Sequence, residues 1–334
     1  MKNVISKDKV QPKDKVQLKD KIQSILLKYS VYIVLILLLI FFSFSSPVFL
    51  TQANMANFFR QIPSVGILTV AYAMVLINGY VDLSIASIAA FSGTAAAYLS
   101  TLGWNPIIVI VVAMMTGAFF GTINGLLIKK LNLPAFILTL GTSYIIRGII
   151  MFITDGIYVT GVTDWFGKLA STNIFGNVIY SSTLIFIILV IVFAYIMKNT
   201  RLGKHSYIVG SNPEAARLSG IDTDKHVVKI FMIEGILAAV AGVLLMSNLN
   251  VGGPNEGQGL DLLAMAAAIM GGIQFSGGVG TIGGAVVGIF TLQIFNNGLS
   301  IMGVNAFMQQ AVTGGIIIFA LVVDYFRRKA EKNN

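Results

Sequence analysis

Apolar stretches of about 20 residues recur along nearly the whole chain, separated by short polar breaks. A helix of about this length crosses the hydrocarbon core of a bilayer. Of the 334 residues, 56% are hydrophobic and only 11% are charged, too few to cover the exterior of a water-soluble fold. The sequence therefore predicts an all-α polytopic membrane protein with about ten transmembrane helices. The candidate spans lie near residues 29–50, 62–78, 84–102, 106–128, 136–153, 180–197, 230–248, 262–275, 280–300 and 309–325.

Basic residues are distributed unevenly among the segments that connect these spans. With both termini in the cytoplasm, twenty of the 23 Lys and Arg residues fall in cytoplasmic segments, as the positive-inside rule requires. Only Arg60 and Lys168 then lie outside, and Arg147 lies within a span. We expect a basic cytoplasmic arm over residues 1–28, a transmembrane domain over 29–326 and a basic cytoplasmic tail over 327–334. The arm is expected to be solvated, with contact to anionic lipid as the alternative.

Glycines in two spans repeat every four residues, a pattern that lets membrane helices approach closely. Residues 117–121 match residues 284–288 as Gly-Ala-x-x-Gly at an offset of half the chain length. Because one of these spans would run inward and the other outward, the match predicts a weak inverted repeat, an organisation common in transporters.

Residues 198–229 form the longest predicted cytoplasmic connection. Asn212 and Pro213 can cap and start a helix there, Glu214 suits its positive end, and Gly220 can end it after roughly two turns. This predicts a short helix outside the membrane, which is either a plain connector or a docking element for a cytoplasmic partner.

Several site classes are not supported by the sequence. Residues 278–283 fit a dinucleotide-binding glycine pattern, but they join two membrane spans rather than a strand and a helix. A phosphate-binding loop is missing, the chain has no Cys, and His205 and His226 lack acidic residues at ligand spacing. The net charge of +9 is concentrated at the chain ends. We therefore expect no catalytic, cofactor or metal site on this chain, no nucleic-acid partner and no ATP hydrolysis by the chain alone.

Five segments, in order, resemble the permease subunits of ribose-type ATP-binding-cassette (ABC) sugar importers, within the branched-chain amino acid/ribose permease superfamily. Residues 78–87 resemble the family's GGIDLSVGS signature, although Asn78 stands where a small residue is usual, and residues 133–141 resemble its PxFIxTLG segment. Residues 214–221 resemble the EAARLSGI coupling loop. Residues 296–299 and 307–310 resemble the closing NNGL and FxQQ features. Glu234, inside a span, departs from the family pattern.

The resemblance implies a multi-pass permease of the bacterial cytoplasmic membrane that forms the pathway for a monosaccharide such as ribose. The implied partners are an ATPase subunit, an extracytoplasmic sugar-binding protein and a second permease copy, identical or closely related. The coupling segment would present Glu214, Ala215, Ala216, Arg217, Leu218 and Gly220 to the ATPase. The resemblance does not identify the particular sugar.

Polar residues in or near the spans are candidates for the substrate pathway, because a sugar needs hydroxyl partners but must not be trapped. They are Asn78, Asp82, Ser84, Ser87, Asn124, Asn296, Asn297 and Gln310. Each of them also suits bonding between helices. Asp82 is the strongest candidate, because a buried carboxylate needs a partner, water or a proton, and Arg147 is a candidate partner.

Two other functions fit parts of the sequence. An ion-coupled secondary transporter of a small polar solute would explain the buried acids and the repeat, but not the coupling segment. A membrane scaffold without transport activity would explain the spans alone.

Overall fold

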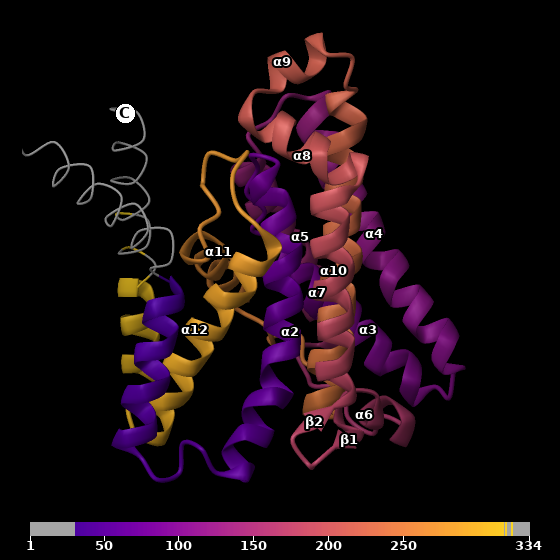
Figure 1. The fold of residues 1–334 in the computed structure, drawn as a ribbon. Coiled ribbons are helices and arrows are strands. Elements are labelled where there is room, and N and C mark those ends of the chain that lie inside the picture. Colours follow the sequence, from indigo (N-terminus) through magenta and orange to yellow (C-terminus); the bar gives the residue numbers. More distant parts are fainter. Residues whose placement is uncertain (1–30, 317, 319–321, 323–334) are drawn as a thin grey trace, which may run out of the picture.

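The computed structural model describes residues 31–316, 318 and 322, and it is helical apart from one small hairpin (Figure 1). The predicted arm over 1–28 and the tail over 327–334 lie outside the described residues. A first helix, Val31–Ser45, is followed by the labelled elements, and a last helical segment starts at residue 306. The labelled elements are α2 (Gln52–Ile77), α3 (Ile85–Thr101), α4 (Pro106–Lys130), α5 (Ala135–Thr154), α6 (Asp164–Ser171), β1 (Asn173–Phe175), β2 (Ile179–Tyr180), α7 (Ser181–Asn199), α8 (Arg201–Ser211), α9 (Pro213–Leu218), α10 (Thr223–Leu249), α11 (Leu260–Met270) and α12 (Ile282–Ile301).

Each of the ten predicted apolar stretches overlaps a helix in the described part of the chain. Six helices there, α2, α4, α5, α7, α10 and α12, are long and apolar enough to cross a membrane. Val31–Ser45, α3 and α11 are apolar but shorter. The all-α polytopic class is therefore confirmed, whereas the count of ten crossings and the cytoplasmic position of both termini stay predictions.

The core of the molecule is built around α2. Its most apolar window is 89% buried, whereas the corresponding windows of α4, α5 and α7 are 22%, 17% and 22% buried. Helices α7, α10, α11 and α12 all pack against α2. The outer helices turn large apolar side chains such as Tyr144 and Phe152 outward, as expected for surfaces that face lipid.

Small residues set the closest helix contacts. A Cβ atom added at Gly117 or Gly121 of α4 would collide with backbone carbonyl groups of α10, at Gly235 and Phe231. Likewise, a Cβ atom at Gly284 of α12 would collide with the backbone of Gly271, just after α11. The close-packing role of these glycines is confirmed, and the two segments proposed as an inverted repeat both supply such contacts. Gly280, which precedes Gly284 and Gly288 at the same four-residue spacing, is not part of a helix, because it lies in the loop before α12. The repeat itself stays a prediction.

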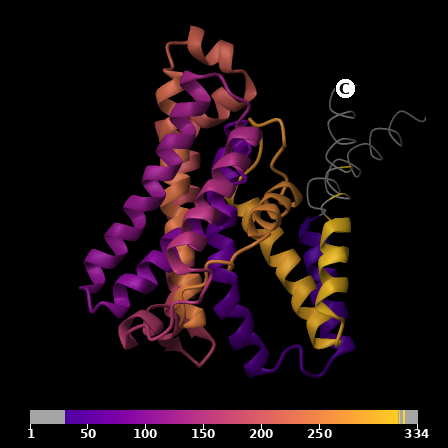
Figure 2. The same ribbon diagram turned by 180° about the vertical axis from the view of Figure 1, so that it is seen from behind.

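The structure has two polar ends. Helices α8 and α9 lie at one end, and α6 with the β1–β2 hairpin lies at the other, as Figures 1 and 2 show from opposite sides. The two strands pair antiparallel, with Asn173 opposite Tyr180. The segment 198–229 is more ordered than the sequence indicated: it contains α8, α9 and the first turns of α10.

We expect Gly121→Ala to lower the free energy of unfolding by about 1–3 kcal/mol, because its methyl group would meet the α10 backbone rather than a movable side chain. Thermal unfolding of the detergent-solubilised protein measures this. The matched control is Gly141→Ala in α5, where no atom lies within 4 Å of the added Cβ. Equal unfolding midpoints for the two variants would contradict the packing account.

Candidate functional site

The short helix α9 is the most exposed element at the α8–α9 end. Asn212 caps it: its side-chain oxygen accepts hydrogen bonds from the backbone N–H groups of Glu214 (3.1 Å) and Ala215 (3.0 Å). Pro213 is its first residue, and the chain leaves through Gly220 at φ +83°, a backbone conformation that glycine adopts readily. The predicted short helix is thus confirmed as a local structure.

The side chains of α9 divide between core and surface. Ala216 is buried against the rest of the molecule, whereas Glu214, Ala215, Arg217, Leu218 and Gly220 are exposed, Leu218 to 83%. The helix therefore offers an acidic, a basic and an apolar side chain to the outside. Basic residues occur in the two helices that flank it, with Arg201 and Lys204 in α8 and Lys225 at the start of α10. Lys129 at the end of α4 pairs with Asp224 at the start of α10, at 3.0 Å.

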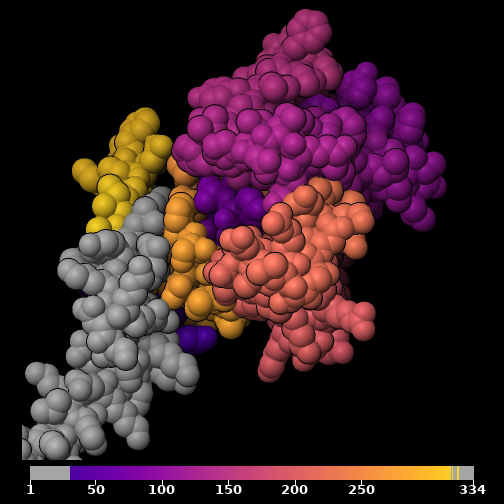
Figure 3. Space-filling view, turned by 90° about the horizontal axis from the view of Figure 1, so that it is seen from above, coloured from indigo at the N-terminus to yellow at the C-terminus, as the bar shows by residue number. Residues whose placement is uncertain are grey.

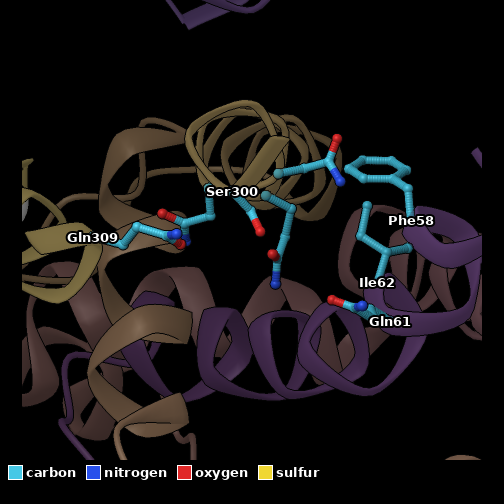
Figure 4. A pocket seen from close by; sticks show the side chains of 8 residues that line it. Phe58, Gln61, Ile62, Ser300 and Gln309 are labelled. Carbon is cyan, nitrogen blue, oxygen red and sulfur yellow. The ribbon is translucent and has the colours of Figure 1, made fainter. Parts of the chain in front are cut away.

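A polar pocket lies between α2 and α12, on the part of α2 far from α9. Its volume is about 170 Å³, and Figure 4 shows side chains from both helices and from the segment after residue 306 around it. The lining residues are Phe58, Gln61, Ile62, Gln293, Asn296, Asn297, Ser300 and Gln309. Five of these eight carry a carboxamide, one carries a hydroxyl, and none of them is charged.

The polar groups of the pocket differ in their hydrogen bonding. Asn297 exchanges two hydrogen bonds with the side chain of Asn54, at 3.0 and 2.9 Å, and so joins α12 to α2. Asn296 accepts a hydrogen bond from Thr313, at 3.2 Å. Gln61, Gln293 and Ser300 make no side-chain hydrogen bond to the described part of the chain. These three groups are free to bind a ligand or water.

Four of the sequence-predicted pathway residues are buried elsewhere, near the end of α2 that is away from the pocket, and three of them form a hydrogen-bond network that reaches α5. Asp82 accepts hydrogen bonds from the backbone N–H (2.5 Å) and hydroxyl (2.6 Å) of Ser84, and Asn124 donates to the same hydroxyl at 2.8 Å. Asn124 in turn accepts from Thr142 of α5, at 2.8 Å. Asn78 ends α2 and is fully buried. Residues 61 and 78 lie 17 positions apart on α2, about 25 Å along the helix axis, so this network and the pocket are separate.

The other polar candidates have different surroundings. Ser87 of α3 shares a hydrogen bond with Ser143 of α5, at 2.7 Å. Gln310 is exposed and does not line the pocket, which instead contains its neighbour Gln309.

Arg147 is not the partner of Asp82, contrary to the expectation from sequence. Its guanidinium donates hydrogen bonds to the carbonyl oxygens of Pro254 (2.7 Å) and Glu256 (2.9 Å), and so holds the glycine-rich loop before α11. The side chain that approaches Asp82 is Glu234 of α10, itself fully buried. Asp82 Oδ2, both Glu234 carboxyl oxygens, the Tyr72 hydroxyl and the Asn78 amide have no hydrogen-bond partner among the described residues.

Sequence reasoning missed Gln61, Gln293, Ser300 and Gln309 as pocket residues. A signal existed for two of them, because Gln293, Asn296, Asn297 and Ser300 follow the spacing of one helix face. A similar signal existed for Gln61, because Asn54, Asn57 and Ser64 of α2 lie seven and four residues before it and three residues after it.

Comparisons with known proteins place the chain in a family. Residues 54–321 match the family described as "Branched-chain amino acid transport system / permease component". The chain is 33% identical over 301 residues to the ribose import permease protein of Escherichia coli (strain K12), an alignment that covers 87% of this chain and 92% of that protein.

Two further relatives give the same result. The ribose import permease protein of Bacillus subtilis (strain 168) is 32% identical over 302 residues, covering 90% of this chain and 94% of that protein. The D-allose transport system permease protein of Escherichia coli (strain K12) is 34% identical over 302 residues, covering 89% and 91%. No solved structure matches the chain. The match over most of its length shows that the chain belongs to the family of branched-chain amino acid transport system permease components.

Proposed function

We propose that this chain is the membrane permease subunit of an ABC importer and forms the translocation pathway for a monosaccharide. The observation that carries this proposal is its similarity, over most of its length, to permeases named for ribose, L-arabinose, D-allose and galactose import. The chain is a multi-pass protein of the bacterial cytoplasmic membrane, in keeping with these relatives and with its apolar helices.

The chemistry of the pocket supports a sugar over an amino acid. A carboxamide both donates and accepts hydrogen bonds, as a sugar hydroxyl does. An amino acid would bring a carboxylate and an ammonium group, and the pocket residues include no charged side chain to balance either one. Weak neutral contacts also suit a pathway that must release its substrate.

Energy would reach the pathway through α9. Its exposed Glu214, Arg217 and Leu218 suit a docking contact with an ATPase subunit, which the chain needs because its sequence carries no phosphate-binding loop. The grouping of basic residues near α9 supports a cytoplasmic position for this end. A sugar-binding protein would deliver substrate to the opposite end, and a second permease copy would complete the transporter.

The ion-coupled alternative has one structural observation in its favour, the buried Asp82 and Glu234 carboxyl groups without full partners. Buried acids in membrane helices mark ion or proton paths in many transporters. The relatives favour the ABC importer over this alternative, and none of those named above is described as ion-coupled.

Disrupting α9 should abolish ATP-driven uptake without removing the chain from the membrane. Glu214→Lys reverses an exposed charge, and Gly220→Pro forces a negative φ where the chain needs +83°. Uptake by vesicles with the assembled transporter, together with the amount of chain in the membrane, tests both. Gly103→Pro is the matched control, since it places the same backbone strain at the exposed end of α3. Normal uptake with Glu214→Lys and Gly220→Pro would remove the coupling role.

Replacing Gln293 with Leu should reduce sugar uptake about three- to tenfold when the sugar concentration is limiting. This is the change in affinity expected from the loss of one neutral hydrogen bond to the sugar. Transport assays over a range of sugar concentrations measure this. Gln310→Leu, just outside the pocket, is the comparison. If Gln310→Leu impairs uptake and Gln293→Leu does not, the pathway does not run through this pocket.

Asp82→Ala should impair folding or uptake, because Ser84 would lose the acceptor of its backbone N–H and hydroxyl, and that hydroxyl is the group to which Asn124 donates. Membrane level and uptake are measured together, and wild-type values for both would make the residue dispensable.

A further inference from the structure

Three backbone segments meet without intervening side chains at the end of α2 nearest α9. The backbone N–H of Gly278, in the loop between α11 and α12, donates a 2.8 Å hydrogen bond to the carbonyl oxygen of Ile77, the last residue of α2. Gly210, near the end of α8, packs on the same carbonyl group: a Cβ atom there would collide with it and would lie 2.6 Å from the Gly278 nitrogen. We call Ile77, Gly79, Gly210, Gly277 and Gly278 the glycine junction.

The junction leaves no room for a side chain at Gly210, Gly277 or Gly278. A Cβ atom at Gly277 would lie 2.6 Å from the Cα atom of Gly79 and 3.1 Å from the carbonyl oxygen of Gly210. Contacts between backbones cannot be relieved by a change of rotamer, so displacement of one segment must displace the others. Figure 3, which looks onto this end of the molecule, shows salmon residues of the α8–α9 region lying against orange residues of the α11–α12 region.

The junction is connected directly to α9. One residue, Asn212, separates α8 from α9. Its N–H donates to the carbonyl oxygen of Ile208 in α8 (3.0 Å), and its side chain caps α9. Asn212 therefore makes hydrogen bonds in both helices. Because of this link, a movement of α9 displaces the end of α8 that carries Gly210.

The junction is also connected to both walls of the polar pocket. Helix α2 leads from Ile77 to Gln61, and the loop through Gly278 leads into α12, which carries Gln293. A second contact strengthens the hold on α12: the Tyr207 hydroxyl of α8 donates to the Gly280 carbonyl oxygen at 2.9 Å. Helix α8 thus contacts the end of α2 and the loop that leads into α12, both away from the pocket.

We propose that the glycine junction transmits displacement of α9 to α2 and α12 together, and so changes the separation of the two pocket walls. Gly210 and Tyr207 are positioning residues in this device, because they act through the helices they contact rather than on the substrate. The inference rests on the proposed function, since the displacement comes from an ATPase docked on α9.

The test uses the full transporter in proteoliposomes, with ATP hydrolysis and sugar uptake measured on the same samples. Gly210→Ala is expected to keep ATP hydrolysis within about twofold of wild type while uptake falls at least about tenfold. Tyr207→Phe, which removes one hydrogen bond, is expected to reduce uptake about three- to tenfold with the same hydrolysis. Gly283→Ala is the matched control, because an added Cβ near the start of α12 meets no atom within 4 Å.

Wild-type uptake in Gly210→Ala and Tyr207→Phe would overturn the junction. So would a parallel loss of hydrolysis and uptake in Tyr207→Phe, because that pattern reports failed assembly. If instead the wild-type transporter shows no ATP-dependent uptake, the proposed function fails and the junction fails with it.

A structural readout separates transmission from folding. The chain has no native Cys, so Gln61→Cys and Ser300→Cys place spin labels on the two exposed pocket walls alone. ATP is expected to shift the distance between the labels in the assembled transporter and in its Gly283→Ala form, but not in its Gly210→Ala form. An unchanged shift in Gly210→Ala would contradict the proposal.

Discussion

Contact between backbones, made possible by glycine, is the interaction on which the rest of this structure depends. Lipid supplies no hydrophobic drive for one apolar helix to join another, so association relies on close packing. Gly117 and Gly121 bring α4 against α10, and Gly271 and Gly284 bring α11 against α12. Gly93 of α3 meets the α10 backbone at Gly242 in the same way. These contacts enclose α2, whose position fixes both the polar pocket and the glycine junction.

The polar groups inside this framework fall into two kinds. Around Asp82, hydrogen bonds among Ser84, Asn124 and Thr142 tie three helices together, which makes most of that network structural. In the pocket, Gln61, Gln293 and Ser300 keep their hydrogen-bonding capacity for something outside the chain. Neutral amides that face a cavity can hydrogen-bond to a hydroxyl-rich solute. The Asp82 network instead holds the helices that contribute to it in a fixed arrangement.

The sequence was sufficient to predict the apolar helices and α9, but not α6, α8, the β1–β2 hairpin or the contacts between elements. Hydropathy located every apolar helix of the described chain, and the cap at Asn212 with the stop at Gly220 predicted α9. The roles of polar residues were harder to predict, because the side-chain amide of an Asn in a span can hydrogen-bond either to another helix or to a solute. Asn296 and Asn297 lie at the pocket, whereas Asn124 lies in the buried network. Arg147 was misassigned because its partners are backbone carbonyl groups, which no side-chain pattern reveals.

The central claim is that this chain conducts a sugar with energy captured by another subunit. The most direct measurement is uptake of radiolabelled ribose, arabinose, allose and galactose by proteoliposomes that contain the chain, its ATPase and its binding protein, with ionophores present. The account predicts uptake of at least one of these sugars that requires both ATP and the ATPase and persists after ion gradients collapse. Uptake by the chain alone, driven by an ion gradient and abolished by ionophores, would contradict it.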